Sequence, residues 1–394
     1  MKERILGVPR NTFVLGITSF LNDFSSEMVY SVFPAFFTAV LGAGAASLGL
    51  VDGIADAASN FFKVYSGSLS DRFQARKPLV VAGYTLSVLT RPFYAIVYAV
   101  SGALGLRFLD RVGKGVRDAA RDAIISLSTP KSELGRSFGY HRAMDTAGAI
   151  LGPLVAYLIL SQFPSRFNFV FFAAFAIGAM AIVSLLFIKD VVVPASARRN
   201  PLVASFPEFS TSFKLFLFAI FVLSSGSLPV AVMLLKTQSI GLIIADIPLF
   251  YMVYNLSYTA FSMAAGKASD RIGARTVILV GYGVLLMSYV LLGIAHSVWP
   301  LITGFLVLGL FPALTDGVLR AYASQLTSED MRGSGLGWLN AANGLGALIA
   351  GTGGGYIWQA YGSTVAFVAV SAVLVCGLVL FFVSAFADSG PSER

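Results

Sequence analysis

The segment GSLSDRFQARKPL, residues 67–79, recurs 199 positions later as GKASDRIGARTVI, residues 266–278. A second pair, SELGRSFGY at 132–140 and EDMRGSGLGW at 329–338, aligns through its last glycine at an offset of 198. Each copy of the first segment directly follows a long apolar run. Two matches at nearly the same offset, in corresponding places, predict that the chain consists of two parallel repeats.

The composition predicts a membrane protein. Hydrophobic residues make up 56% of the chain, charged residues make up 12%, and the mean hydropathy is +0.78. The apolar runs, of about twenty residues, are long enough to cross a bilayer as helices. They are continuous, whereas the strands of a membrane barrel alternate apolar and polar residues. We expect twelve spans, at 11–40, 46–69, 78–98, 103–127, 137–161, 167–188, 213–236, 246–268, 275–295, 299–325, 333–357 and 361–386.

The repeats also predict the domain organisation. A polar stretch at 189–212 separates an N-terminal six-helix bundle, 1–188, from a C-terminal six-helix bundle, 213–394. Lys and Arg concentrate in this stretch and in the loops expected on its side of the membrane. The positive-inside rule therefore places the linker and both termini in the cytoplasm, in a multi-pass protein of the inner membrane. The net charge of +8 follows from the same loops, so nucleic-acid binding is not expected.

The first apolar run resembles a signal peptide because basic residues precede it. It contains Asp23 and Glu27, however, and no small-residue cleavage site follows, so we expect a retained helix. The single cysteine, Cys376, can form no internal disulfide. With two histidines and no metal-ligand cluster, we expect neither a metal nor another cofactor. The expected partners are the lipid bilayer, a small-molecule substrate and protons, and we expect a monomer.

The first repeated segment resembles the G-x-L-x-D-R-x-G-R-[KR] signature of the major facilitator superfamily. It follows the second span, as it does in that family, although Gln74 stands where the family usually has Gly. In the fifth span, GAILGP resembles the G-x-x-x-G-P signature of the drug:proton antiporter branch through Gly148, Gly152 and Pro153. The resemblance covers the whole chain. It implies an all-α membrane protein with twelve helices in two pseudo-symmetric six-helix bundles, which works by alternating access.

The repeated segments are expected to form a cytoplasmic gate. Their glycines would allow close helix packing, and their aspartates would interact with a neighbouring helix N-terminus. Their arginines would pair with acids at the ends of the fourth and tenth spans, and such pairs would break when the gate opens. The alternative is charge that only sets the topology. The predicted gate residues are Gly67, Asp71, Arg72, Arg76, Asp122, Gly266, Asp270, Arg271, Arg275 and Asp316.

The fourth span is unusual because RFLDRVGKGVRDAARDA, residues 107–123, carries eight charges. It lacks the G-x-x-x-x-G-K-[ST] pattern after a strand, so it is no phosphate-binding loop. At about 100° per residue, all eight charges fall on one arc of roughly 140°. A span of this kind turns its polar strip towards the bundle interior. Arg111, followed four residues later by Gly115, resembles a family signature in which the Arg is associated with proton transfer.

Two sets of buried polar residues are candidates for function. Asp23, Glu27, Asp145 and His141 are the proton-coupling candidates, because burial favours a protonated carboxyl and a nearby Arg favours the carboxylate. The alternative for these acids is a permanent ion pair. Arg91, Arg111, Lys114, Arg117, Asn340 and Asn343 are the substrate-cavity candidates, and the arginines would suit an anionic or zwitterionic group. The alternative for the bases is neutralisation by nearby acids.

At the repeat offset of 198, Asn343 takes the place of Asp145. This predicts a division of labour, with proton coupling in the N-terminal half and a more apolar wall in the C-terminal half. The sequence thus favours a secondary transporter, not an enzyme, that carries out proton-coupled efflux of a small organic solute. One alternative is a proton- or cation-coupled importer of an organic anion. Another is a membrane scaffold or sensor without transport.

Overall fold

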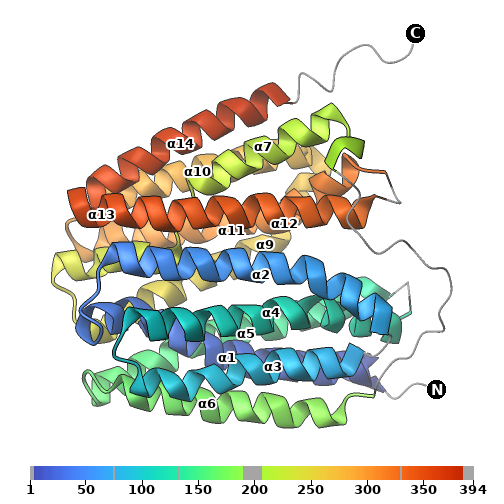
Figure 1. The fold of residues 1–394 in the computed structure, drawn as a ribbon, viewed down its shortest axis with the longest axis horizontal. Helices are drawn as coiled ribbons and strands as arrows, with labels where there is room; N and C mark the ends of the chain where they lie inside the picture. Colours follow the sequence, from blue (N-terminus) through green and yellow to red (C-terminus); the bar gives the residue numbers. More distant parts are fainter. Residues whose placement is uncertain (1–3, 74–75, 131–132, 190–205, 329–330, 385–394) are drawn as a thin grey trace. The chain divides into compact units, whose positions relative to one another are not determined.

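Long helices account for nearly all of the chain in the computed structural model (Figure 1). The structure describes residues 4–73, 76–130, 133–189, 206–328 and 331–384. The helices are α1 (Arg10–Ala39), α2 (Ala45–Phe73), α3 (Arg76–Phe93), α4 (Val100–Ser128), α5 (Leu134–Gln162), α6 (Phe167–Ser184), α7 (Thr211–Ser225), α8 (Val230–Leu234), α9 (Ile247–Ile272), α10 (Ala274–Gly293), α11 (Val298–Gln325), α12 (Arg332–Ile349), α13 (Gly355–Tyr361) and α14 (Ser363–Ser384).

Each of the twelve expected spans corresponds to a helical segment, and two of these segments are interrupted. The seventh consists of α7, α8 and the 3₁₀ turn η5 (Leu235–Ile240), with a break at residues 226–229 where Pro229 precedes α8. The eleventh consists of α12 and α13 joined by a π-helical turn, η7 (Ala350–Gly354). Both interruptions contain glycine or proline, which weaken or prevent the regular helical hydrogen-bond pattern.

The residues pack into two compact units. Unit 1 comprises Met1–Gly42, Ala58–Pro201 and Leu242–Met252. Unit 2 comprises Ala43–Ala57, Leu202–Gly241 and Val253–Arg394. Relative to a division at 1–188 and 213–394, two short segments are exchanged: the first turns of α2 pack with unit 2, and the first turns of α9 pack with unit 1. The predicted linker, 189–212, lies largely outside the described residues.

Glycines set the closest helix contacts in unit 1, where α1 packs on α5 and α6, and α3 packs on α4. A Cβ atom on Gly148 of α5 would lie 2.5 Å from the carbonyl oxygen of Phe20 in α1. One turn later, a Cβ on Gly152 would lie 2.6 Å from the carbonyl oxygen of Phe24. Side chains at these positions would collide with backbone, which explains why the helix-5 motif carries small residues.

Unit 2 also has glycines at its closest helix contacts. Within it α7 packs on α12 and α14, and α10 packs on α11 and α14. A Cβ on Gly346 of α12 would lie 2.8 Å from the carbonyl oxygen of Phe221 in α7. The first turns of α2 lie against η7, where a Cβ on Gly49 would lie 2.1 Å from the carbonyl oxygen of Gly351. Backbone-to-backbone packing of this kind needs glycine on both helices.

The structure adds a short hairpin that the all-helical expectation did not include. Strands β1 (Arg4–Ile5) and β2 (Val8–Pro9) pair antiparallel ahead of α1. Leu6 and Gly7 connect them with positive φ angles of 50° and 78°. These angles match the turn geometry that two-residue hairpins prefer. The hairpin is tied to the start of α5 by an ion pair of 2.8 Å between Arg4 and Glu133.

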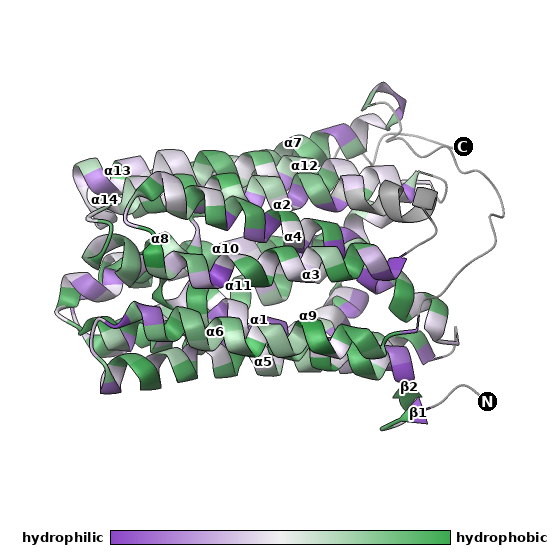
Figure 2. Ribbon diagram, turned by 60° about the horizontal axis from the view of Figure 1, so that its bottom comes forward, coloured by the Kyte–Doolittle hydropathy of each residue, from purple (hydrophilic) through white to green (hydrophobic). Residues whose placement is uncertain are grey.

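The lipid-facing surface is recognisable from exposed apolar side chains. On α6 these include Phe172, Met180 and Val183, and on α14 they include Val368 and Val379. Such large exposed apolar area is unfavourable in water and suits a hydrocarbon environment. In the described residues, seven helical segments are long and apolar enough to span a membrane by composition. In Figure 2 the ribbon of α6 is mostly in hydrophobic colours, whereas hydrophilic colours mark α4.

Candidate functional site

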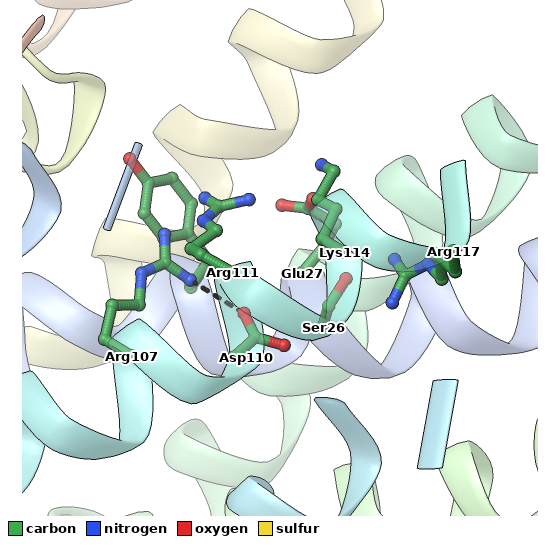
Figure 3. Close-up of a pocket in the computed structure, with 8 residues that line it drawn as sticks. Ser26, Glu27, Arg107, Asp110, Arg111, Lys114 and Arg117 are labelled. Carbon is green, nitrogen blue, oxygen red and sulfur yellow. Dashed lines mark ion pairs between the residues drawn. The ribbon is translucent and has the colours of Figure 1, made fainter. Parts of the chain in front are cut away.

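A polar pocket lies in unit 1 between α1 and α4. The space between its lining side chains, together with the solvent into which it opens, measures about 270 Å³. Ser26, Glu27 and Tyr30 of α1 face it, and one strip of α4 supplies Arg107, Asp110, Arg111, Lys114 and Arg117 (Figure 3). The spacing of these α4 residues, three or four apart, puts them on one face of the helix. The polar strip expected for the fourth span therefore lines a cavity.

Glu27 is held in the pocket by a tyrosine. The hydroxyl of Tyr251, at the start of α9 and within unit 1, donates to a carboxylate oxygen of Glu27 at 2.6 Å. The ring of Tyr251 also makes an edge contact with Tyr30, with the centroids 5.2 Å apart. A hydrogen bond to a carboxylate is short and strong. Glu27 is thus oriented by a partner far away in the sequence.

The guanidinium of Arg107 is fixed against aromatic rings at one end of the pocket. Its Cζ lies 4.4 Å from the centroid of the Tyr30 ring and 5.4 Å from that of Phe33. A guanidinium nitrogen lies 3.6 Å from a carboxylate oxygen of Asp110. The positive charge of Arg107 is therefore shared between two ring faces and one acid.

Arg117 and Lys114 differ in how they are held. Arg117 is nearly fully buried, donates to Ser87 Oγ at 3.0 Å and lies over the Tyr84 ring at 4.4 Å. Asp118 Oδ1 is 3.8 Å from its Nε. For Lys114, no hydrogen bond or ion pair within 4.0 Å is found among the described residues, while it interacts electrostatically with Asp23 and Glu27. The Lys114 ammonium is the pocket's most adaptable charge.

The pocket lining carries more positive than negative charge, with four basic side chains against two acidic ones. Arg107 and Asp110 form a pair, and Glu27 bonds to Tyr251. An anionic or zwitterionic group would gain charge-assisted hydrogen bonds here, because Arg can bind it through two nitrogens. The acid in the same pocket, Glu27, can take up a proton and so change the pocket's charge.

Arg91 belongs to a neighbouring network between α3, α1 and α6. Its guanidinium donates to Asn22 Oδ1 at 2.7 Å and to Ser25 Oγ, and Ser25 donates in turn to the carbonyl of Ala174. Arg91 is only 2% exposed, and a Cβ on Gly178 would collide with it. It lines a second, smaller space of about 220 Å³ with Arg107 and Asp110. Its neutral partners all come from the scaffold, so substrate contact stays a prediction.

His141 and Asp145 lie together on α5. Nδ1 of His141 is 3.4 Å from a carboxylate oxygen of Asp145, and its Nε2 is hydrogen-bonded to Ser19 Oγ at 2.8 Å. Ser19 is also 3.0 Å from the Tyr84 hydroxyl, which links α1, α3 and α5. On α1, Asp23 Oδ1 accepts from the side-chain amide of Asn22 at 3.1 Å. Glu27 thus lines the pocket, and the other proton-coupling candidates, the half-buried Asp23 and Asp145 and the buried His141, take part in hydrogen bonds or an ion pair on α1 and α5.

Comparison with known proteins decides the family. The family model of the Major Facilitator Superfamily matches residues 15–237 and 215–394, which together cover almost the whole chain. The chain belongs to the Major Facilitator Superfamily. This membership confirms the fold class expected from the sequence and confirms that the chain is a transporter and not an enzyme.

Individual relatives agree with this membership. An uncharacterized MFS-type transporter of Methanocaldococcus jannaschii is 37% identical over 391 residues, which cover 95% of both chains. The class H tetracycline resistance protein of Pasteurella multocida is 24% identical over 291 residues, 68% of each chain. Among solved structures, that of a point mutant of the nucleoside transporter NupG has a TM-score of 0.82 at 16% identity, with 95% of this chain and 99% of that chain covered.

The superfamily signature, which begins in the last turns of α2 and α9, is described in full only in its second copy. The side chains of Gly67, Asp71 and Arg72 lie outside the described residues, whereas Arg76 is buried at the start of α3. In the second copy, Gly266, Asp270 and Arg271 are exposed near the end of α9. Gly273, which ends this copy's turn, has a φ of +88°. Glycine adopts this angle without strain, which gives a physical reason for the signature's second glycine.

The signature arginines were expected to pair with acids such as Asp122 and Asp316, and Arg275 has another partner in this structure. Arg275 donates instead to the backbone carbonyl of Phe382 at 2.7 Å, and Asp316 accepts from the Tyr258 hydroxyl at 2.9 Å. Asp122 forms its ion pair with Arg121 of the same helix, at 2.9 Å. The spacing of these residues brought them to helix ends, but backbone carbonyls and a tyrosine were nearer partners. Their gating role stays a prediction.

The two C-terminal candidates, Asn340 and Asn343, lie on α12 in unit 2, and neither is among the residues that line the two spaces of unit 1. Asn343 accepts a hydrogen bond from Ser224 at 2.8 Å. Sequence reasoning missed Ser19 and Tyr84 as parts of the buried network. Tyr84 has a signal that could have found it, because Tyr282 occupies the same place at the repeat offset of 198.

Proposed function

We propose that this transporter couples the movement of a small organic solute to protons and exports that solute by alternating access. The observation that carries the proposal is Glu27, a carboxyl that faces the polar pocket together with Lys114 and Arg111. A group that can gain or lose a proton inside the pocket connects proton binding to solute binding by electrostatics alone. The distribution of Lys and Arg supports an inner-membrane protein with both termini in the cytoplasm.

The direction of transport is supported by a relative. The class H tetracycline resistance protein is similar over 68% of this chain, and the fifth span carries the G-x-x-x-G-P pattern of the drug:proton antiporter branch. Export against a gradient requires that proton and solute exclude each other from the pocket. A positively charged solute fulfils this condition, because it binds ionised Glu27 and leaves when Glu27 is protonated.

A second candidate, coupled uptake of an organic anion, is favoured by the excess of basic side chains in the pocket. An anion would bind at Lys114 and Arg111, where ionised Glu27 repels it. Protonation of Glu27 would remove this repulsion, so that proton and anion bind together and move in the same direction. The sign of the coupling therefore distinguishes the two candidates, whichever solute proves to be the substrate.

Vesicles containing the purified protein would test both candidates. Pooled metabolites and amphipathic drugs are screened for counterflow, and then for accumulation driven by an imposed pH gradient. Efflux predicts accumulation in acid-loaded vesicles, whereas anion uptake predicts accumulation when the outside is acidic. If no solute moves under any gradient, the transport proposal fails and the scaffold or sensor alternative stands.

Glu27→Gln separates coupling from binding. For uptake of an anion, we expect this variant to keep counterflow and to lose accumulation driven by the pH gradient. For efflux of a cation that binds ionised Glu27, we expect counterflow and accumulation to fall together, because the amide cannot carry the negative charge. If accumulation still follows the pH gradient in this variant, Glu27 is not the coupling group. Glu208→Gln in the exposed turn η4 (Phe206–Glu208) is the matched control, since it makes the same chemical change away from the pocket.

A further inference from the structure

The crossing of α1 and α5 brings two aspartates together. Besides its contact with Phe20, a Cβ on Gly148 would lie 2.7 Å from the amide nitrogen of Phe24 and 3.3 Å from the carbonyl carbon of Asp23. Asp145 precedes Gly148 by three residues and so lies on the same face of α5. Asp145 is also the charged side chain with the largest electrostatic effect on the carboxyl of Asp23.

Unit 2 contains the same crossing with neutral residues. A Cβ on Gly346 would lie 2.8 Å from the carbonyl oxygen of Phe221, 2.9 Å from the amide nitrogen of Ser225 and 2.4 Å from the Cβ of Ser224. Asn343 precedes Gly346 by three residues. Here the two side chains bond directly, with Ser224 Oγ donating to Asn343 Oδ1 at 2.8 Å.

These contacts show which residue of α1 corresponds to which residue of α7. In each unit the glycine faces the carbonyl of one residue and the amide four residues later. The offset is 198 between α5 and α12, but it is 201 between α1 and α7. Asp23 is therefore the counterpart of Ser224, just as Asp145 is the counterpart of Asn343. One crossing thus joins its helices by a neutral hydrogen bond, and the other presents two carboxyls.

We propose that Asp23 and Asp145 share a single proton and form a second proton-binding site of this transporter, beside Glu27. Two carboxylates at this crossing repel each other, whereas a carboxyl and a carboxylate form a strong hydrogen bond. With one proton the pair reproduces the link that Ser224 and Asn343 make in unit 2. The proton belongs to the pair and not to either residue alone. The role of this site in coupling rests on the proposed function.

The surroundings of the pair leave one carboxylate oxygen able to carry this proton. In the described structure Oδ1 of Asp145 is buried without a hydrogen-bond partner, while Oδ2 faces His141. The helices packed against α1 and α5 bring both signs of charge, and α6 has no ionisable residue. The ionisable groups around the pair are Glu27 on α1; Tyr84 and Arg91 on α3; Lys114, Arg117, Asp118 and Arg121 on α4; and His141 and Arg142 on α5.

Lys114 connects this pair to the pocket. It interacts electrostatically with Asp23 of the pair and with Glu27 of the pocket, which lies one helical turn further along α1. When the pair loses its proton, it gains one negative charge and draws the Lys114 ammonium more strongly. Lys114 is then less available to bind a solute in the pocket. The pair would thereby change solute affinity without touching the solute.

Infrared spectroscopy of the full-length protein in lipid nanodiscs tests the pair directly. Protonated carboxyls absorb apart from carboxylates, so they can be counted at neutral pH without any substrate. We expect Asp23→Asn and Asp145→Asn each to lose one protonated carboxyl relative to the wild type. Glu27→Gln serves as the matched carboxyl-to-amide control and should keep the absorption of the pair. The double variant D23S/D145N copies the neutral pair of unit 2 and should fold even if a single variant does not.

Three results would overturn the proposal: survival of the signal of the pair in D145N, its survival in D23N, or its loss in E27Q. The first would place the proton on Asp23 alone or elsewhere, the second would place it on Asp145 alone or elsewhere, and the third would place it on Glu27. Counterflow in vesicles reports separately on the proposed function. Solute movement without the shared proton contradicts only the pair, and a shared proton without solute movement contradicts only transport.

Discussion

Unit 1 and unit 2 have equivalent glycine contacts between their helices, but different side chains link those helices. Arg91 in unit 1 joins the third span to α1 through Ser25, and its repeat counterpart Tyr289 joins α10 to α7 by donating to the carbonyl of Gly226 at 3.0 Å. In both units a glycine of the third span packs on the next helix: Gly83 against Arg117, and Gly281 against Thr315. The glycine contacts are thus common to both units, whereas the buried charges lie largely in unit 1.

This difference indicates where function resides. Among the described residues of unit 2, Asp52 and Lys236 are buried charges, but the links between its helices described above are neutral hydrogen bonds, so the dense charge cluster of unit 1 is not required by the shared packing plan. Buried ion pairs are a weak source of stability, because desolvation offsets much of their attraction. Charges kept at that cost are candidates for function.

The largest expected effect comes from the fourth span of unit 1. Arg117→Ala should lower the free energy of unfolding by about 2–4 kcal/mol, because it removes the hydrogen bond to Ser87 Oγ and the contact of the guanidinium with the Tyr84 ring. Thr315→Ala at the equivalent place in unit 2 should cost only about 1 kcal/mol. Chemical unfolding in detergent micelles measures both. Equal costs would show that the charge of Arg117 contributes nothing beyond packing. This result would contradict the difference between the two units.

The shared glycine contacts should respond alike in the two units. Gly148→Val and Gly346→Val should each destabilise the protein by about 1–3 kcal/mol, since the new side chain meets backbone atoms within 3 Å. Gly283→Ala in α10 is the control, because its Cβ would meet open space. It should raise stability by up to about 1 kcal/mol through helix propensity. Tolerance of valine at only one of the two crossings would contradict a common packing plan.

The neutral link of unit 2 should have a smaller effect. Tyr289→Phe removes a hydroxyl that bonds both the carbonyl of Gly226 and, at 2.8 Å, the amide of Leu228. We expect a loss of about 1–2 kcal/mol in unfolding free energy and no change in counterflow per folded molecule. A loss of counterflow at unchanged stability would assign unit 2 a direct role that the comparison does not give it.

The smallest effect is expected at the neutral crossing. Ser224→Ala breaks the hydrogen bond to Asn343 and should cost about 0.5–1.5 kcal/mol. Because neither residue ionises, this cost should be the same at acidic and neutral pH. Unfolding measured at both pH values checks this. A cost that varies with pH would mean that a charged group reaches the crossing, and the crossing could then not serve as the neutral reference for Asp23 and Asp145.

Hydropathy and repetition were enough to predict the architecture. Helices in a membrane must satisfy their own backbone hydrogen bonds, so long apolar runs translate directly into spans. The eight charges of residues 107–123 predicted a polar strip on the fourth span, and that strip lines the pocket. These predictions succeeded because each depends on local sequence alone.

The hydrogen-bond or ion-pair partner of an individual side chain could be predicted only where the two repeats align. The signature arginines were expected to pair with acids such as Asp316, yet Arg275 bonds to the carbonyl of Phe382 and Asp316 to the hydroxyl of Tyr258. The contact of Tyr251 with Glu27 joins residues 224 positions apart, and no motif connects them. Arg91 was expected in the substrate cavity, yet its bonds go to Asn22 and Ser25 of the scaffold.

The sequence by itself determined the twelve spans, the two repeats and the correspondence of Asp145 with Asn343, because apolar runs and a recurring motif are properties of the chain read in order. Only the tertiary structure decided that Asp23 corresponds to Ser224. The first spans of the two halves share no motif, and their register differs by three residues from that of the fifth spans. That register depends on which backbone atoms each glycine meets, and this is settled only when the helices pack.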